Sequence, residues 1–232
     1  MLERFYNNTN VFEYSLDEVG RGCLFGRVYI ACVVLPKDVT LFDGKNIKDS
    51  KKFSSKKKMM EVAEYIKNNA LAWHVSYIDE KIIDEINILQ ATMRGMHECL
   101  DCIISKLNAY QDLDKSMALI DGNYFIPYRR FDLSKNCIVE LPHITIEKGD
   151  NKFMGIAAAS ILAKSARDSY INDLCKQYPI LIEKYGLDTN MGYGTKKHLD
   201  GIREHGITEW HRRSFGNLCR ESNVNCIKIK EP

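Results

Sequence analysis

Strand-like apolar runs that are each followed by an acidic residue constrain the fold of this chain most strongly. The first run alternates apolar and polar residues over residues 11–16 and leads to two adjacent carboxylates, Asp17 and Glu18. Because neighbouring side chains on a strand point to opposite faces of a sheet, these two acids cannot both enter a core. They repel one another unless a cation or water holds them. Taken alone, the pair favours a charged turn over a divalent-metal site.

Two further apolar runs are also followed by an acid. Residues 117–120 form a short run that is typical of a buried strand, and Asp121 comes directly after it. Residues 144–147 form another strand-like run, which Asp150 follows. Carboxylates that converge at strand ends around one crevice would form an oxygen-rich site of the kind that Mg²⁺ or Mn²⁺ prefers. The later acids therefore shift the preference to a metal site.

Helical patterns separate the strand-like runs, and this alternation predicts the fold class. An alanine-rich segment, small and apolar on all sides, predicts a buried helix. The expected helices cover residues 59–66, 82–86, 89–107 and 152–178, and further strands are expected over residues 28–35, 70–78 and, with turns, 124–142. Strands interleaved with helices predict an α/β protein with a central sheet.

Polar residues that precede three of the helical segments are expected helix caps. Ser54 or Ser55 would cap the first helix, Asp79 the second, and Thr195 a helix in the tail. A lysine-rich run, residues 48–58, lies at and before the first of these N termini, where free N–H groups also attract anions. The alternative is a solvated lysine face, and the sequence leaves both interpretations open.

Basic and aromatic residues in the second half are candidate ligand contacts. Lys164 and Arg167 share one face of the alanine-rich helix and are expected to point toward a ligand; alternatively, Lys164 pairs with Asp168. Tyr193 stands between two glycines and is either a binding aromatic or a turn residue that packs on its neighbours. Residues 210–215 interleave basic and aromatic side chains.

Composition predicts a cytoplasmic protein without a membrane span. With 232 residues, 45% of them hydrophobic, the chain is long enough for one sizeable domain with a packed core. Its net charge is only +2, so any affinity for nucleic acid must come from local basic patches. No apolar run approaches the ~20 residues of a membrane span, and the amino terminus lacks the pattern of a signal peptide. The eight cysteines lack zinc-ligand spacing and are expected to be reduced thiols.

The acids and the basic segments together predict a nuclease. Two divalent ions about 4 Å apart would clamp the attacking and leaving oxygens of a phosphodiester. Basic and aromatic side chains in loops would hold a nucleic-acid backbone. A P-loop phosphotransferase is another chemistry for phosphate, but the chain has no Gly-x-x-x-x-Gly-Lys-Ser/Thr sequence.

The chain resembles type 2 ribonuclease H, the ribonuclease HII family, from Glu13 to about Phe215. The resemblance rests on segments that follow the order of the family: residues 17–22, 49–52, 121–122, 148–150, 156–164, 192–195 and 211–215. It implies a ribonuclease H-like fold over residues 1–185, with a central mixed β-sheet flanked by helices. It also implies that residues 186–232 form a C-terminal helical extension packed on the same domain.

The resemblance further implies a two-metal-ion endonuclease that uses Mg²⁺ or Mn²⁺. Such an enzyme hydrolyses the phosphodiester 5′ of ribonucleotides embedded in duplex DNA, and the RNA of RNA–DNA hybrids, leaving 3′-hydroxyl and 5′-phosphate ends. This activity serves ribonucleotide excision repair and DNA replication. The implied catalytic and metal-binding acids are Asp17, Glu18, Asp121 and Asp150. Asp17 would bridge both ions, Asp150 would hold the ion that carries the water nucleophile, and Glu18 and Asp121 would serve the leaving-group side.

Substrate contacts carry over from the same family segments. The backbone of Gly20, Arg21 and Gly22 would read the ribose 2′-hydroxyl, where side chains on the glycines would block close approach. Tyr193 would stack on the deoxyribose beyond the RNA–DNA junction. The expected phosphate contacts are Ser50, Lys51, Lys164 and Arg213.

A few residues of the chain depart from the family pattern. Ser15, Arg27, Lys48 and Met191 differ from the residues that are common in the family, and none of these changes removes a metal ligand.

The nearest rival is type 3 ribonuclease H. That family resembles this chain less well, because its first loop has Gly-Lys-Gly where this chain has Arg21 between the glycines, and it usually carries an additional amino-terminal domain. Another rival is a binding scaffold that keeps the fold without catalysis. The loss of one of the four acids would support that interpretation, and all four are present. The tail shows no aromatic-paired motif for a sliding clamp, and a monomer is expected.

Overall fold

The computed structural model describes residues 2–48, 50, 53, 55–133 and 135–225. Its contacts divide the chain into two compact units. The first, called here the sheet unit, contains residues 1–19, 29–76 and 93–165; the second, the helical unit, contains residues 20–28, 77–92 and those from 166 on. The domain boundary expected after residue 185 stays a prediction. In the described part of the chain, no helix has both the length and the apolar character needed to cross a membrane.

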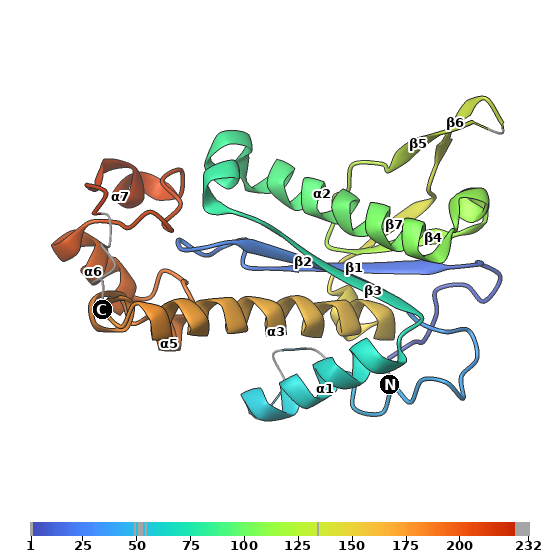
Figure 1. Cartoon of the computed structure of the whole chain (residues 1–232), viewed down its shortest axis with the longest axis horizontal. Helices are drawn as coiled ribbons and strands as arrows, with labels where there is room; N and C mark the ends of the chain where they lie inside the picture. The colour runs from blue at the N-terminus through green and yellow to red at the C-terminus, as the bar shows by residue number, and fades with distance from the viewer. Residues whose placement is uncertain (1, 49, 51–52, 54, 134, 226–232) are drawn as a thin grey trace. The chain divides into compact units, whose positions relative to one another are not determined.

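A five-stranded mixed sheet forms the centre of the fold (Figure 1). Its strand order is β3 (Ala72–Ile78), β2 (Val28–Val34), β1 (Glu13–Val19), β4 (Met117–Asp121) and β7 (His143–Ile146). Strand β1 is antiparallel to β2 and parallel to β4, and β4 is parallel to β7. The predicted α/β class with a mixed sheet is confirmed.

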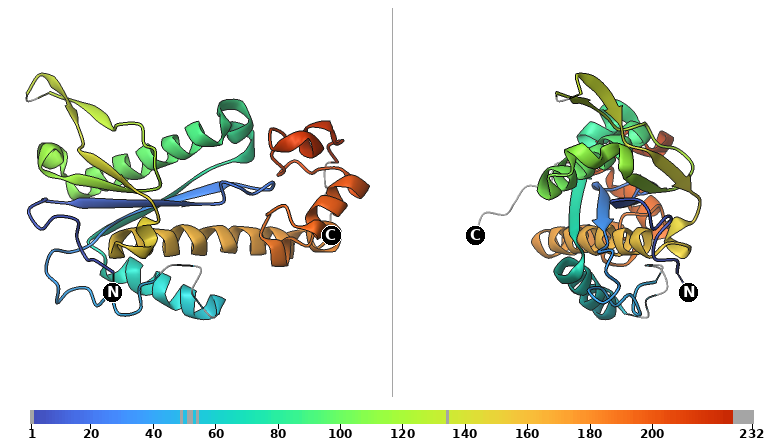
Figure 2. Two further views of the ribbon diagram at one scale, coloured as in Figure 1. Left: turned by 180° about the vertical axis from the view of Figure 1, so that it is seen from behind. Right: turned by 90° about the vertical axis from the view of Figure 1, so that its right-hand side faces the viewer.

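Helices cover both faces of the sheet within the sheet unit. Residues of α2 (Glu80–Leu107) from Met93 onward lie on one face, whereas α1 (Lys56–Asn69) and the first half of α3 (Met154–Gln177) lie on the other (Figures 1 and 2). Two glycines permit close contact with the strands. A Cβ at Gly95 would lie 2.4 Å from Ile30 Cδ1, and one at Gly155 would lie 2.2 Å from Ser15 Oγ.

Two of the three predicted caps form the expected hydrogen bonds. Ser55 Oγ accepts from the backbone N–H of Lys58 (3.2 Å), and Asp79 Oδ1 accepts from that of Ile82 (2.9 Å). Within α2, Asn87 leaves the helical conformation (φ 66°), which separates the two predicted helical stretches. Thr195 does occupy the cap position of α6 (Lys196–His205), but its side chain makes no capping hydrogen bond.

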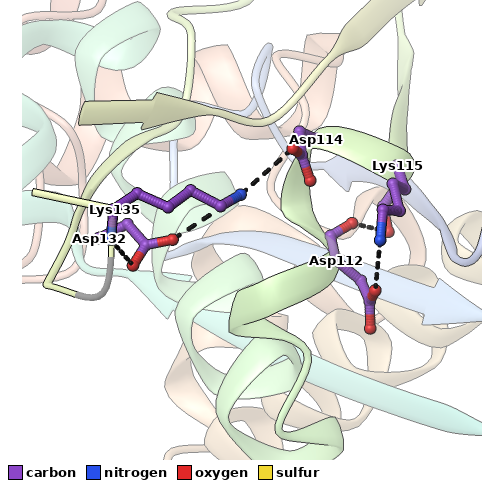
Figure 3. Close-up of polar contacts among 6 residues, drawn as sticks. Asp112, Asp114, Lys115, Asp132 and Lys135 are labelled. Carbon is purple, nitrogen blue, oxygen red and sulfur yellow. Dashed lines mark hydrogen bonds and ion pairs between the residues drawn. The ribbon is translucent and has the colours of Figure 1, made fainter. Parts of the chain in front are cut away.

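The region from residue 124 to 142 forms a two-stranded antiparallel hairpin, β5 (Arg129–Asp132) and β6 (Cys137–Glu140), in agreement with the predicted short strands. Lys135 connects this hairpin to the 3-10 helix η2 (Tyr110–Lys115), since its Nζ lies 3.2 Å from Asp114 Oδ2 and 3.9 Å from Asp132 Oδ2 (Figure 3). These ion pairs are largely exposed, so they tie the hairpin to η2 with little energy.

The helical unit has a core of its own. Short helices α4 (Ile180–Tyr185), α5 (Leu187–Asn190) and α7 (Gly216–Glu221) accompany α6 and the second half of α3. Their buried apolar side chains pack together with Phe25 from the segment that follows β1; the cluster comprises Phe25, Ile171, Cys175, Leu181, Tyr185, Leu187, Met191, Ile202, Ile207 and Cys219. The C-terminal residues therefore do form the predicted helical extension.

Candidate active site

Asp17 and Asp121 lie near the ends of two neighbouring parallel strands: β1 continues past Asp17 to Val19, and Asp121 is the last residue of β4. The register between β1 and β4 pairs Leu16 with Ile120, and each acid is the next residue in its strand. Because parallel strands end at the same edge of a sheet, the two carboxylates come to that edge together. Glu18 follows Asp17 and is half-buried.

Asp150 reaches the same edge from the turn after β7. Strand β7 pairs with β4 so that Asp121 lies opposite Ile146. The chain then turns through Lys148, which has a left-handed backbone (φ 55°), into the 3-10 helix η3 (Gly149–Asn151). The Gly149 N–H donates to Asp121 Oδ1 at 2.6 Å, so the turn that carries Asp150 is bonded to the carboxylate of its neighbour strand.

Burial and like charge raise the pKa of Asp17 well above its usual range. The main cause is burial, since the side chain is only 5% exposed, and the next causes are the carboxylates of Glu18 and Asp121. A hydrogen bond from Ser160 and one from the Glu18 N–H, which lies 2.7 Å from Asp17 Oδ1, act in the opposite direction. The carboxylates of Glu18 and Asp121 thus lie close enough to Asp17 to oppose its ionisation.

The chemistry of this group suits a divalent cation. Its donors are carboxylate oxygens in a largely buried position, which is the donor type of Mg²⁺ and Mn²⁺ sites. A bound cation would remove the repulsion that raises the pKa of Asp17. Among the described residues, no three His, Cys, Asp or Glu side chains stand in a metal-holding arrangement.

Ser160 supports Asp17 from α3, a role that the sequence argument did not assign. Its hydroxyl bonds to Asp17 and lies 3.1 Å from Ser50 Oγ. Ser50 is only 7% exposed, and its contact with a phosphate stays a prediction. The signal in the sequence was a single hydroxyl within a run of alanines on a buried helix. Lys164, half-buried, lies one turn further along α3.

The other expected substrate contacts belong to the helical unit, except Lys51, which lies outside the described residues. Arg21 and Gly22 are exposed. Tyr193 is 45% exposed. Arg213 is exposed too, and its backbone N–H donates to Asp84 Oδ2 (2.8 Å). Each of these positions is accessible to a ligand.

Arg167 does not point toward a ligand, so that expectation is wrong. The side chain is 1% exposed and donates to the backbone carbonyls of Phe25 (3.0 Å), Met191 (2.9 Å) and Arg27. Arg212, also fully buried, donates to the carbonyls of Gly26 (2.8 Å) and Arg21 (3.1 Å). Carbonyls of an irregular loop need donors when they are buried, and the two guanidinium groups supply them.

Comparisons with known proteins agree with this fold. The family model for Ribonuclease HII matches residues 15–218. Ribonuclease HII of Phocaeicola vulgatus is 42% identical over 213 residues, which are 92% of this chain and 93% of that protein. Ribonuclease HII of Bacteroides thetaiotaomicron is 41% identical over 220 residues, 95% of this chain and 96% of the relative.

Solved structures show the same fold at lower identity. The PCNA:RNase HII complex from Archaeoglobus fulgidus has a TM-score of 0.63 at 24% identity, covering 89% of this chain and 96% of that one. Ribonuclease H2 from Pyrococcus horikoshii OT3 has a TM-score of 0.60 at 20% identity, covering 91% and 96%. Bst-RNase HIII in complex with Mn²⁺ has a TM-score of 0.58 at 15% identity, covering 93% and 70%.

The mixed-sheet fold that this chain shares with these structures is the fold of one class of proteins, the type 2 and type 3 ribonucleases H. Within that class, the family match extends over most of the chain, and curated relatives share about two-fifths of its residues. The chain belongs to the ribonuclease HII family, whose members are metal-dependent hydrolases that act as endonucleases on RNA–DNA hybrids.

Proposed function

We propose that this protein hydrolyses the phosphodiester on the 5′ side of ribonucleotides embedded in duplex DNA, as well as the RNA of RNA–DNA hybrids. The products would carry 3′-hydroxyl and 5′-phosphate ends. The observation that supports this most directly is the meeting of Asp17, Asp121 and Asp150 at one edge of three adjacent parallel strands. Membership of the ribonuclease HII family supports the same substrate class.

Four acids would hold two divalent ions, Mg²⁺ or Mn²⁺. In this proposal Asp17 contacts both ions, Asp150 the ion on the side of the attacking water, and Glu18 and Asp121 the ion on the side of the leaving oxygen. When bound, the ions supply charge stabilisation at both of these oxygens. The chain's own contribution is to hold the acids in place: the Gly149 N–H orients Asp121, and the Ser160 hydroxyl orients Asp17.

Recognition of the RNA–DNA junction would come from two exposed segments of the helical unit. The backbone of Gly20, Arg21 and Gly22 would bond to the ribose 2′-hydroxyl, the group that distinguishes RNA from DNA. Of these three residues, Gly20 is buried and the other two are exposed. The ring of Tyr193 would stack on the next deoxyribose. Phosphate contacts by Ser50, Lys51, Lys164 and Arg213 complete the proposed interface.

The proposed setting is ribonucleotide excision during DNA replication and repair in the cytoplasm, carried out by a monomer. The substrate itself supplies the partner that the site needs, namely a duplex with at least one ribonucleotide. The Archaeoglobus fulgidus structure is a complex with PCNA, whereas no clamp partner is part of the proposal for this chain.

The test uses a labelled DNA duplex with a single ribonucleotide, incubated with Mg²⁺ or Mn²⁺. We expect one nick immediately 5′ of the ribonucleotide, lost in Asp121→Asn and kept in Asp173→Asn, whose carboxylate is exposed on α3 and pairs with Lys176. Cutting confined to long RNA–DNA hybrids would contradict the proposed preference. Binding without cutting in either metal would overturn the enzymatic role.

A further inference from the structure

We propose that Arg167 is a positioning residue that joins the two sugar-reading segments into one rigid recognition element, so that ribose and deoxyribose are read as a single step. The first segment is the Gly-Arg-Gly loop, residues 20–28, and the second is the Tyr193 loop, residues 190–194. The inference rests on the proposed function, because it takes from there the roles of these two loops.

One buried guanidinium bonds to both loops. Arg167 Nη2 donates to the carbonyl of Phe25 in the Gly-Arg-Gly loop (3.0 Å) and to that of Met191 in the Tyr193 loop (2.9 Å). Its Nη1 donates to the carbonyl of Arg27. A guanidinium has five donors in a planar fork, and no other side chain can serve three carbonyls in this fixed geometry. The two loops therefore share one anchor.

Close packing leaves the loops no room to shift against this anchor. Gly20 and Gly192 both have positive φ values, 97° and 90°. A Cβ at Gly20 would lie 2.7 Å from Arg167 Nε, and one at Gly192 would lie 2.9 Å from the Phe25 carbonyl oxygen. Glycine is required at both positions, because a side chain would push the arginine or the neighbouring loop away.

The loops also bond to each other directly. The Leu24 N–H donates to the Gly192 carbonyl at 2.9 Å, one residue before Tyr193. Cys23 Sγ lies 3.8 Å from the Met191 carbonyl oxygen. Because of these direct contacts, a displacement of either loop would also displace the other.

A pair of buried histidines holds the Tyr193 loop from its other side. The Thr208 N–H donates to His211 Nδ1 (2.9 Å), so the proton of neutral His211 is on Nε2. That N–H faces His198 Nε2 at 3.1 Å, which leaves His198 Nδ1 as the donor to the Tyr193 carbonyl at 2.9 Å. With the histidines on one side and Arg167 on the other, the backbone at Tyr193 is fixed while its ring stays exposed.

The consequence for specificity is that recognition of the ribose and recognition of the next deoxyribose depend on one another. If the loops moved independently, the loss of the Tyr193 ring would have the same cost whatever the state of Arg167. Because they are joined, the ring can test the next sugar only while Arg167 holds its loop against the Gly-Arg-Gly loop. Arg167 touches no substrate atom in this scheme.

The experiment compares kcat/KM on two duplexes, one with a single ribonucleotide in DNA and one with a continuous RNA strand paired to DNA. Wild type, Tyr193→Ala, Arg167→Lys and the double variant are measured, each at a temperature where its unfolding curve shows a folded protein. Arg203→Lys is the matched control, because this arginine is exposed on α6 and forms an ion pair with Asp200.

We expect Arg167→Lys to reduce the preference for the single-ribonucleotide duplex at least about tenfold, and the cost of Tyr193→Ala to shrink by a similar factor in the Arg167→Lys background. Such coupling between residues that share a network corresponds to a non-additive double-mutant cycle. Equal costs of Tyr193→Ala in both backgrounds, with the substrate preference of Arg167→Lys unchanged, would overturn the inference.

A second variant covers the case in which Arg167→Lys does not fold. Gly192→Ala forces the Tyr193 loop away from the Phe25 carbonyl and should produce the same loss of preference and the same non-additivity. If wild type cuts neither duplex, the proposed function fails. If wild type prefers the single-ribonucleotide duplex and Tyr193→Ala abolishes that preference, while Arg167→Lys and Gly192→Ala both retain it, only the coupling fails.

Discussion

The sheet unit and the helical unit both contain buried charged side chains, but these side chains have different partners. At the strand ends, Asp17 lies beside two other carboxylates, and the pKa of its side chain is raised by burial and by their negative charge. In the helical unit, Arg167 and Arg212 are as deeply buried, yet each donates to backbone carbonyls of its own unit. Burial and the charge of Arg167 lower the pKa of Arg212 only to about 10, so it stays charged at neutral pH.

This difference separates the acids, which are proposed to bind metal ions, from the arginines, which hold loops of the helical unit in place. The carboxylates repel one another and gain stability only when a cation from outside joins them. The guanidinium groups already donate to backbone carbonyls of the chain, so their removal leaves buried carbonyls without donors. Mutations at the two places should therefore fail in different ways: loss of activity without loss of stability at the acids, and loss of stability at the arginines, together with loss of substrate preference at Arg167.

The largest effect is expected for Asp17→Asn. Cleavage of the single-ribonucleotide duplex should fall at least about a thousandfold, because several kcal/mol of transition-state stabilisation by bound metal are lost. Without divalent ions the variant should be at least as stable as wild type, since one member of a repelling group is neutral. Single-turnover cleavage and urea unfolding in EDTA measure both quantities. A clear loss of stability together with retained cleavage would break the comparison.

Arg212→Met should show the opposite pattern. We expect the free energy of unfolding to fall by about 2–4 kcal/mol, because the carbonyls of Gly26 and Arg21 lose their buried donor at about 1–3 kcal/mol each. Urea unfolding in EDTA is the measurement, and Arg203→Met, at an exposed position, is the control. A variant as stable as this control would mean that the buried guanidinium does not support the loop.

Acidification should act on the helical unit through its buried histidines. Burial, and then the neighbouring His198, hold the pKa of His211 well below its ordinary value of 6.5. The unfolded chain therefore binds a proton more readily than the folded one, so stability is complete above pH 6.5 and falls as the pH drops below it. The slope should reach at most about 1.4 kcal/mol per pH unit for one such group.

The measurement is urea unfolding at several pH values between 5 and 8 in the Asp17→Asn background, which removes the carboxylate with the opposite sign of shift. Replacing His211 by Asn in that background should flatten the acid limb. An unchanged limb would assign the pH dependence to other groups.

The smallest effect is expected where charge lies at the surface. Lys135 pairs with Asp114 and Asp132 while its side chain is 42% exposed (Figure 3). Lys135→Met should change the free energy of unfolding by less than about 1 kcal/mol, because exposed ion pairs gain little over hydrated ions. A larger loss, measured by the same urea unfolding, would show that position in the hairpin matters more than burial.

The sequence predicted the sheet and the acids well for a physical reason. Alternation of apolar residues is a local property, and so is the position of an acid directly after an apolar run; Asp17 and Asp121 could therefore be placed at strand ends before any tertiary contact was known. The helix caps at Ser55 and Asp79 were equally readable, since each bonds to an N–H three residues later.

The role of Arg167 could not be predicted in the same way. Its helix was expected to be buried, but its carbonyl partners at Phe25 and Arg27 lie about 140 residues away in sequence. Ser160 was missed for a similar reason, since the sequence of an alanine-rich helix does not show which strand residue a given hydroxyl on it will meet. Thr195 stands at a helix start as predicted, yet whether its side chain bonds there depended on the surrounding loop.

Sequence by itself thus determined the strands of the central sheet, the longer helices and the acids that follow the apolar runs, because these follow from side-chain periodicity within a few residues. Only the tertiary structure decided which buried charges meet like charges and which meet carbonyls. That choice depends on segments far apart in the chain, and it separates the carboxylates that are proposed to bind a cation from the arginines that hold the loops.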